Sequence, residues 1–177
     1  MRLYYDVEFL ETGACIDFIS IGMVAEDGRE LYAVSDSFDQ ESVWRHPFLK
    51  QHVWPSLPIA KNPPGVRGMD HLDVHHPDVR PRPQIARMVH SFIQRVPDVE
   101  LWSWYCGYDH VALCGLWGTM ADLPEGVPMF THDLQQEISR LGNPAIPEQK
   151  QGHHHALEDA RYHAAIGRFL TELENQQ

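Results

Sequence analysis

An acidic pair inside an apolar run near the N-terminus constrains the fold of this chain more than any other feature. Asp6 and Glu8 are two residues apart within the run 3–9, which is otherwise apolar. Side chains of a β-strand alternate between its two faces, so the acids share one face while Tyr5, Val7 and Phe9 share the other. Carboxylates at this spacing repel each other, and a divalent cation is the simplest compensation. The run therefore predicts a strand that presents a cation-binding site.

Two later segments supply further groups suited to such a site. They are Tyr108-Asp109-His110 and His154-His155-Ala156-Leu157-Glu158-Asp159. Mg²⁺ or Mn²⁺ takes few carboxylates, so four acids are a suitable set for two ions: Asp6, Glu8, Asp109 and Asp159. Two such ions can activate a water and stabilise the leaving oxygen of a phosphodiester. Taken alone, Asp109 could simply cap a helix, but the joint pattern favours the metal site.

His154 is the candidate general base. The unperturbed pKa of a histidine, about 6.5, leaves it mostly neutral near pH 7. It precedes Asp159 by five residues, which is too far round for one helical face, so we expect it in the loop ahead of the helix. His155 lies one helical turn before Asp159 and is the alternative.

Length and composition fit one soluble, cytoplasmic domain over residues 1–177. A chain of 177 residues can bury a core without disulfides. Its three cysteines, Cys15, Cys106 and Cys114, form no CxxC pair, so we expect reduced core thiols. The early acids exclude a signal peptide, and no apolar span reaches the roughly 18 residues that cross a membrane.

Charge gives two opposing indications about a nucleic-acid substrate. A formal net charge of −11 is unfavourable for nonspecific binding to phosphates. The segment 44–96 nevertheless has eight basic residues against three acids, a balance of +5. The basic residues are Arg45, Lys50, Lys61, Arg67, Arg80, Arg82, Arg87 and Arg95. This segment is compatible with gripping a phosphate backbone, and equally with an ordinary solvated surface.

The remaining patterns predict a mixed α/β layer fold. Apolar runs over 16–25 and 31–35, joined by Asp27-Gly28, indicate a hairpin, so the first three strands form an antiparallel meander. Helices are expected over 42–53, 84–96, 107–116, from Thr131 or Asp133 to Gly142, and over 156–173; strands are expected over 99–105 and at Met129-Phe130. Leading strands followed by alternating helices and strands are typical of a sheet flanked by helices.

The stretch 61–83 is expected to be a long loop. It contains Pro63, Pro64, Gly65, Gly68, Pro77, Pro81 and Pro83, and such loops are commonly functional or mobile. A separate zinc ion could use its Asp and His residues, although a merely polar loop is the simpler interpretation. These residues are Asp70, His71, Asp73, His75 and His76.

Side chains beside the acids are candidate substrate contacts. Phe9 could stack on a base, as aromatic residues do in proteins that bind single strands. Trp102 and Trp104 share a face of the expected strand, where burial in the core is the favoured interpretation. The full set of candidate contacts is Val7, Phe9, Trp104 and Tyr108.

Three segments together resemble the motifs of DEDDh-type 3′→5′ exonucleases of the RNase H-like superfamily. They are Asp6-x-Glu8, Tyr108-Asp109-x-x-x-Leu113 and His154-x-Ala156-Leu157-x-Asp159-Ala160. Within that group, residues 5–9, 20–30 and 108–114 are similar to the actinobacterial polyadenylate-specific 3′-exoribonucleases. The resemblance spans nearly the whole chain.

The resemblance implies an RNase H-like core and the release of nucleoside 5′-monophosphates from a single-stranded or overhanging RNA 3′ end. It implies that Asp6 bridges two ions, that Glu8 and Asp159 complete the catalytic-metal site, and that Asp109 holds the second ion partly through water. His154 would be the general base. A homodimer is compatible with the resemblance, because relatives are often dimers.

Two departures from the family pattern concern the contacts to the terminal nucleotide. Many relatives have Thr-Gly directly after the first Glu, whereas here residues 9–11 precede Thr12-Gly13. Tyr105 stands where relatives often carry Asn. A DNA-directed exonuclease with the same site remains an alternative, as does a noncatalytic RNA- or nucleotide-binding module. The intact set of four acids and His154 speaks against the module, since a binder does not need all five.

Overall fold

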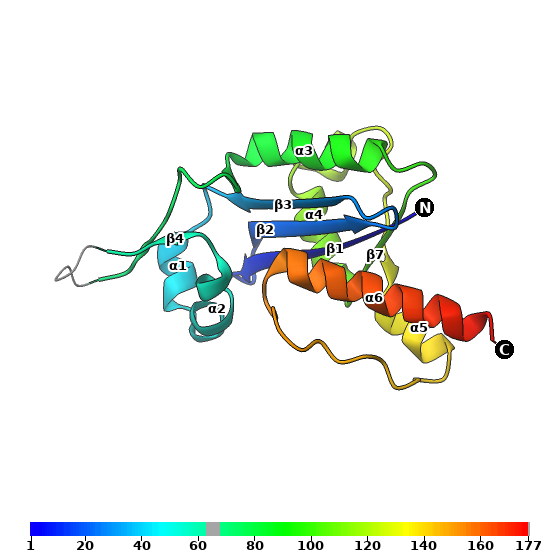
Figure 1. Cartoon of the computed structure of the whole chain (residues 1–177). Helices are drawn as coiled ribbons and strands as arrows, with labels where there is room; N and C mark the ends of the chain where they lie inside the picture. Colours follow the sequence, from blue (N-terminus) through cyan, green and yellow to red (C-terminus); the bar gives the residue numbers. More distant parts are fainter. Residues whose placement is uncertain (63–67, 177) are drawn as a thin grey trace.

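The structure is a computed structural model that describes residues 1–62 and 68–176 (Figure 1). Among these residues, a six-stranded mixed sheet has the strand order β6-β3-β2-β1-β7-β8, and β4 pairs with β5 separately. The strands are β1 Arg2–Glu11, β2 Ile16–Ala25, β3 Glu30–Ser35, β4 Ile59–Ala60, β5 His71–Leu72, β6 Val79–Arg80, β7 Glu100–Ser103 and β8 His132–Asp133. The helices are α1 Gln40–Arg45, α2 Pro47–His52, α3 Arg82–Gln94, α4 Cys106–Cys114, α5 Leu134–Arg140 and α6 Ala156–Glu174, with 3-10 turns η1 Trp54–Ser56 and η2 Met120–Asp122.

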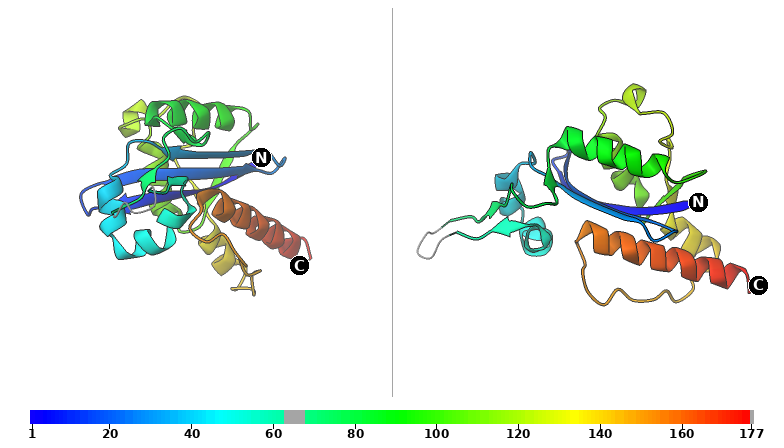
Figure 2. Two further views of the ribbon diagram at one scale, coloured as in Figure 1. Left: turned by 60° about the vertical axis from the view of Figure 1, so that its left-hand side comes forward. Right: turned by 45° about the horizontal axis from the view of Figure 1, so that its top comes forward.

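Helices cover both faces of the sheet (Figure 2). On one face, Tyr5 and Val7 of β1 belong to the same buried cluster as Ile85 of α3. On the other face, Tyr4 belongs to the same cluster as Ala160 of α6. This alternation along β1 confirms the predicted period of two, and it leaves Asp6 and Glu8 on the face that α6 covers.

The predicted antiparallel meander is confirmed. β1 pairs antiparallel with β2, and β2 pairs antiparallel with β3. Gly28, with φ of +86°, provides the left-handed conformation in the β2–β3 turn. β7 then adds parallel to β1, and β8 parallel to β7, so the sheet is mixed as expected.

Two glycines allow α6 to pack closely on the sheet. A Cβ added at Gly22 would lie 2.3 Å from backbone atoms of Ala156 and Leu157. A Cβ added at Gly167 would lie 2.1 Å from the hydroxyl of Tyr4. Because real Cβ contacts are essentially never this short, a side chain at Gly22 would displace the backbone of α6, and one at Gly167 would force either Tyr4 or the helix to shift.

The predicted helix 42–53 is wrong in one respect, because Pro47 divides it into α1 and α2. Proline has no N–H and disfavours helical backbone in the residue before it. His46 is accordingly extended, with φ of −75° and ψ of 116°, and its Nδ1 accepts a hydrogen bond from the N–H of Leu49. Both helices pack at one end of the sheet, where Leu49 shares a buried cluster with Leu10 and Val34 (Figure 1).

The predicted loop 61–83 contains more regular structure than its prolines suggested. Within it, β5 pairs antiparallel with β4, which lies just before this stretch, β6 pairs with β3, and α3 already begins at Arg82. The ladders arise from pairing with distant residues, which local composition does not report. Pro63, Pro64, Gly65 and Arg67 lie outside the described residues.

Two further expectations need correction. Met129 and Phe130 do not form a strand; both side chains are exposed, and the strand β8 follows them. Cys15 is not a core thiol, because it lies exposed in the turn between β1 and β2, while Cys106 and Cys114 are partly buried. All three cysteines are free, as expected. In the described part of the chain, no helix has the length and hydropathy needed to span a membrane.

Candidate active site

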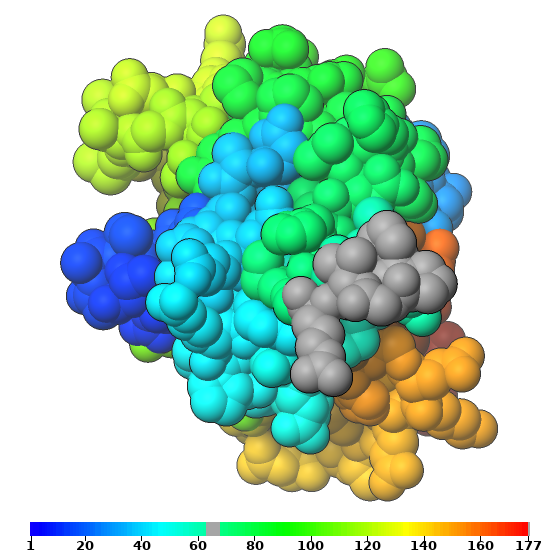
Figure 3. Space-filling view, turned by 90° about the vertical axis from the view of Figure 1, so that its left-hand side faces the viewer, coloured from blue at the N-terminus to red at the C-terminus, as the bar shows by residue number. Residues whose placement is uncertain are grey.

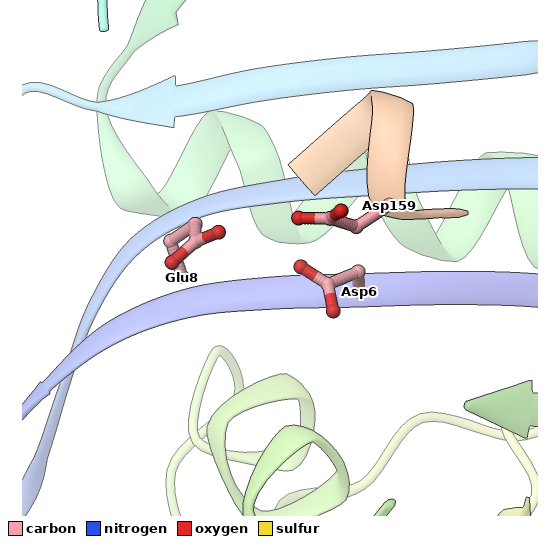
Figure 4. A group of neighbouring side chains, drawn as sticks. All are labelled: Asp6, Glu8 and Asp159. Atoms are coloured by element: carbon pink, nitrogen blue, oxygen red, sulfur yellow. The ribbon is translucent and has the colours of Figure 1, made fainter. Parts of the chain in front are cut away.

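Three carboxylates meet where β1 passes the first turn of α6 (Figure 4). Asp6 and Glu8 extend from β1, and Asp159 extends from α6 toward them. One carboxylate oxygen of each residue lies within 4.8 Å of the others. Three of the four predicted metal ligands, drawn from opposite ends of the chain, are therefore in reach of a shared cation.

Contacts between α6 and the sheet hold Asp159 in this place. His163, one helical turn after Asp159, is buried, and its Nδ1 lies 3.0 Å from the carbonyl oxygen of Tyr5. A carbonyl only accepts, so Nδ1 carries the proton and donates. Gly22, directly opposite Asp6 in the β1–β2 ladder, leaves room for the helix backbone. No motif of the sequence pointed to His163, although its spacing of four from Asp159 places both on one helical face.

Asp109 lines the same cavity from α4, which lies beside β1. It is not one of the three acids whose carboxylate oxygens lie within 4.8 Å of one another. β1 and β7 pair over Arg2–Tyr4 and Glu100–Trp102. Beyond these residues, the start of α4 lies beside β1, where the Asp109 carboxylate accepts hydrogen bonds from the hydroxyl of Ser103 and the N–H of Val7. The sequence did not indicate that Ser103 donates a hydrogen bond to this candidate ligand.

Asp109 does not cap α4, because Asp133 serves that purpose. The Asp133 carboxylate accepts hydrogen bonds from the N–H groups of Tyr105 at 3.3 Å and Cys106 at 3.2 Å. It also accepts one from the N–H of Gln135 at 2.8 Å, which confirms its predicted role as the N-cap of α5. The Asp133 carboxylate therefore binds N–H groups at the start of both α4 and α5. Asp109 is not needed as a cap, and it lines the cavity.

Three acids of the site, Asp6, Glu8 and Asp109, have raised pKa values. Burial, followed by repulsion from Asp109, Glu8 and Asp159, raises the pKa of Asp6 well above its usual range. Burial and the nearby Asp159 and Asp109 raise the pKa of Glu8 to about 8. Burial raises the pKa of Asp109 to about 7, although the hydrogen bonds from Ser103 and Val7 oppose this. A bound cation would favour the ionised forms of all three.

His154 lies in the loop before α6, as predicted, and lines the cavity with Asp159. Its backbone has a φ of +63°. Burial lowers the pKa of His154, and the neighbouring His52 and His153 lower it further, against the opposing effect of Asp159. The imidazole is therefore neutral near pH 7. His155, the alternative, instead stacks on Tyr32, with ring centroids 4.5 Å apart.

A cavity of about 670 Å³ opens over the carboxylates. All four predicted substrate contacts line it: Val7, Phe9, Trp104 and Tyr108. The rings of Phe9 and Tyr108 are nearly parallel, at 18°, with centroids 6.0 Å apart. Trp104 is only partly buried, whereas Trp102 is buried in the core, as the favoured interpretation predicted.

Polar groups close to the site complete its surroundings. The side-chain amide of Gln149 donates to Asp159 at 2.6 Å. Four buried side-chain polar atoms find no hydrogen-bond partner among the described residues: Ser20 Oγ, the Tyr32 hydroxyl, Arg82 Nε and His155 Nδ1. Ser20 is the residue paired with Glu8 in the β1–β2 ladder.

The zinc alternative for the stretch 61–83 gains no support. The acidic trio is the one group of three or more candidate ligands that the described residues bring within 4.8 Å. The five residues considered for zinc form no such group: Asp70, His71, Asp73, His75 and His76.

Sequence similarity to known proteins shows the family of this chain. Over 177 residues, the chain is 42% identical to 3'-5' exoribonuclease Rv2179c of Mycobacterium tuberculosis strain ATCC 25618 / H37Rv, covering 99% of this chain and 96% of the relative. The same figures hold for 3'-5' exoribonuclease MT2234.1 of strain CDC 1551 / Oshkosh. The chain belongs to this family of 3′-5′ exoribonucleases. No protein-family model matches it.

A solved structure shows the fold. S. pombe Pop2p, in its Mg²⁺- and Mn²⁺-bound form, matches with a TM-score of 0.50 at 14% sequence identity, over 96% of this chain and 81% of that chain. The predicted RNase H-like sheet flanked by helices is thereby confirmed.

Proposed function

We propose that this protein is a DEDDh-type, metal-dependent 3′→5′ exoribonuclease that releases nucleoside 5′-monophosphates from RNA 3′ ends. The observation that carries the proposal is the meeting of Asp6, Glu8 and Asp159 within 4.8 Å. They lie in a cavity that His154 and Asp109 also line. Membership of a family whose members are named 3'-5' exoribonucleases supports the same reaction here.

The donor set suits two Mg²⁺ or Mn²⁺ ions. All four candidate ligands offer hard carboxylate oxygens, which these ions prefer. Burial and neighbouring acids raise the pKa values of Asp6, Glu8 and Asp109, so their ionised forms are unfavourable unless a cation compensates the charge. Asp6, Glu8 and Asp159 would hold one ion, and Asp6 with Asp109 the other. Bound there, the ions supply positive charge to the scissile phosphate and the leaving oxygen.

His154 would take the proton from the attacking water. The lowered pKa keeps its imidazole neutral near pH 7, so it can accept that proton. General-base catalysis of this kind contributes about 10²- to 10⁴-fold in rate. We therefore expect His154→Ala to bind metal normally and to lose turnover by about that factor.

Aromatic side chains beside the acids would position the terminal nucleotides. Phe9 and Tyr108 form a stacked pair in the cavity wall, and Trp104 lines it as well. Stacking of a base on an aromatic ring contributes about 1–3 kcal/mol and tolerates any base. This arrangement fits a single-stranded 3′ end, whose bases are free to unstack.

The deciding experiment is the mass-resolved digestion of a 5′-labelled oligoribonucleotide with Mg²⁺ or Mn²⁺. We expect a ladder that shortens from the 3′ end and that EDTA and Asp6→Asn abolish. Glu172→Gln removes the same charge from an exposed position late in α6, and should digest normally. An intact substrate in the presence of metal would refute the proposal, and retained RNA binding in that case would favour the noncatalytic module. A matched DNA strand tests the DNA-directed alternative in parallel.

A further inference from the structure

We propose that α2 and η1 form a clamp that holds His154 in its catalytic position, with Ser56 as the main positioning residue. The clamp is defined by Phe48, His52 and Ser56. The inference rests on the proposed function, because it concerns the general base assigned there.

His154 occupies a backbone conformation that needs external support. Its φ of +63° lies in the left-handed region, which residues with a Cβ adopt at an energetic cost. It belongs to the segment 141–155, which contains no helix or strand. A strained residue in an irregular segment keeps one conformation only where its surroundings fix it.

The clamp provides that support through three contacts from a segment far away in the sequence. The hydroxyl of Ser56 donates to the backbone carbonyl of His154 at 2.7 Å. The ring of Phe48 meets the imidazole edge-on, with centroids 4.9 Å apart and an interplanar angle of 82°. His52 adds a third contact, with ring centroids 5.3 Å apart. Peptide group and side chain of His154 are thus both restrained.

The clamp is itself anchored to the sheet that carries the acids. Leu49, Val53 and Trp54 are buried in one cluster with Leu10 of β1 and Ile19 of β2. Figure 3 shows α1 and α2, in cyan, on the same end of the molecule as the orange segment that leads into α6. This cluster fixes the clamp relative to β1, the strand of Asp6 and Glu8, and the clamp in turn fixes His154 relative to that strand.

Ser56 has one hydroxyl proton and two acceptors within reach. Its Oγ lies 2.7 Å from the carbonyl oxygen of Val53 as well as from that of His154. The bond to Val53 is local to the turn, whereas the bond to His154 joins two distant segments. Removing the hydroxyl takes away the contact that joins these two segments, whereas threonine keeps a hydroxyl whose single proton can still be donated to His154.

The first test compares steady-state kinetics of Ser56→Ala, Ser56→Thr and the wild type on an oligoribonucleotide. Displacement of a catalytic group by a fraction of an ångström to 1 Å costs up to about 10²-fold, so we expect Ser56→Ala to lower kcat about 10-fold. KM and Mn²⁺ affinity should stay within about twofold, because the site of the ions is untouched. Ser56→Thr should restore most of kcat. Gln51→Ala, at an exposed position in the neighbouring helix α2, is the matched control.

The second test asks whether Ser56 acts through His154. In a His154→Ala background, Ser56→Ala should cause no further loss of kcat, since the group it positions is gone. An equal loss in both backgrounds, or full activity of Ser56→Ala, would overturn the clamp. Normal rates for His154→Ala would overturn the assigned base and the clamp together. Should Ser56→Ala fail to fold, Phe48→Leu replaces it in the same cycle, because Phe48 is 47% exposed and tolerates change.

Discussion

We expect Gly22→Ala to displace the start of α6 and thereby to weaken both metal binding and stability. Gly22 lies opposite Asp6 in the β1–β2 ladder, and the backbone of Ala156 and Leu157 passes directly over it. The added Cβ would stand 2.3 Å from those backbone atoms, where ordinary contact begins at 3.4 Å. The first turn of α6 must therefore move outward by the difference, about 1.1 Å.

This displacement would act directly on the proposed metal site, because Asp159 lies three residues after Ala156 in the same helix. Its carboxylate would move away from Asp6 and Glu8, whereas Mg²⁺ requires its ligands at about 2.0–2.1 Å in near-ideal geometry. A misplacement of about 1 Å can cost about 10²-fold in activity. Overpacking of a core typically costs about 1–3 kcal/mol of stability, and contact with backbone places this variant at the upper end.

Three measurements check the prediction: Mn²⁺ affinity by calorimetry, unfolding in urea with EDTA, and exonuclease rate. Gly107→Ala is the matched control, because Gly107 lies in α4 with nothing within 4 Å of an added Cβ. It should bind Mn²⁺ as the wild type does and be equally or slightly more stable. Wild-type Mn²⁺ affinity and stability in Gly22→Ala would refute the argument that this glycine sets the position of α6.

Three other predictions follow from the electrostatics and hydrogen bonds of the site. Without metal, the folded protein retains protons on Glu8, whose pKa is about 8 against 4.5 in the unfolded chain, and on Asp109, whose pKa is about 7. With respect to these groups, stability in EDTA should therefore be highest below about pH 4 and should fall toward pH 8, by up to about 5 kcal/mol for Glu8 alone; saturating Mn²⁺ should abolish the trend in urea titrations. Ser103→Ala removes a hydrogen bond that favours ionised Asp109, so Mn²⁺ affinity should drop about 10- to 100-fold while the melting temperature in EDTA changes little; an unchanged affinity would contradict this role. Tyr32→Phe removes a buried hydroxyl that has no partner among the described residues, so it should leave stability unchanged or raise it by about 1 kcal/mol; a clear loss would show that the hydroxyl is hydrogen-bonded, to Ser20 or to a bound water.

The local patterns of the sequence were sufficient for the elements that rely on periodicity or turn chemistry. The alternation around Asp6 and Glu8 gave their common face, and Asp27-Gly28 gave the β2–β3 hairpin. Asp133 was recognisable as a helix cap because capping depends on near neighbours. These features need only a few adjacent residues, which explains why they could be read from the chain alone.

Features that depend on distant segments were missed. β4 and β5 exist because they pair with each other across the intervening stretch, against its loop-like composition. The hydrogen bond between Ser56 and His154 joins residues that share no local pattern. Pro47 is the exception, because a proline inside the predicted helix is a local signal for the break between α1 and α2. The convergence of Asp159 with Asp6 and Glu8 was inferable from motifs, but the two glycine contacts that permit it were not.

The double cap at Asp133 has a consequence for how this protein tolerates change. Because one carboxylate starts both α4 and α5, the short edge strand β8 sets the orientation of the helix that carries Asp109. A substitution of Asp133 would thereby act on Asp109, the proposed metal ligand. Variation in the outermost strand of the sheet is therefore expected to change the placement of Asp109, although that strand supplies none of the residues that line the cavity.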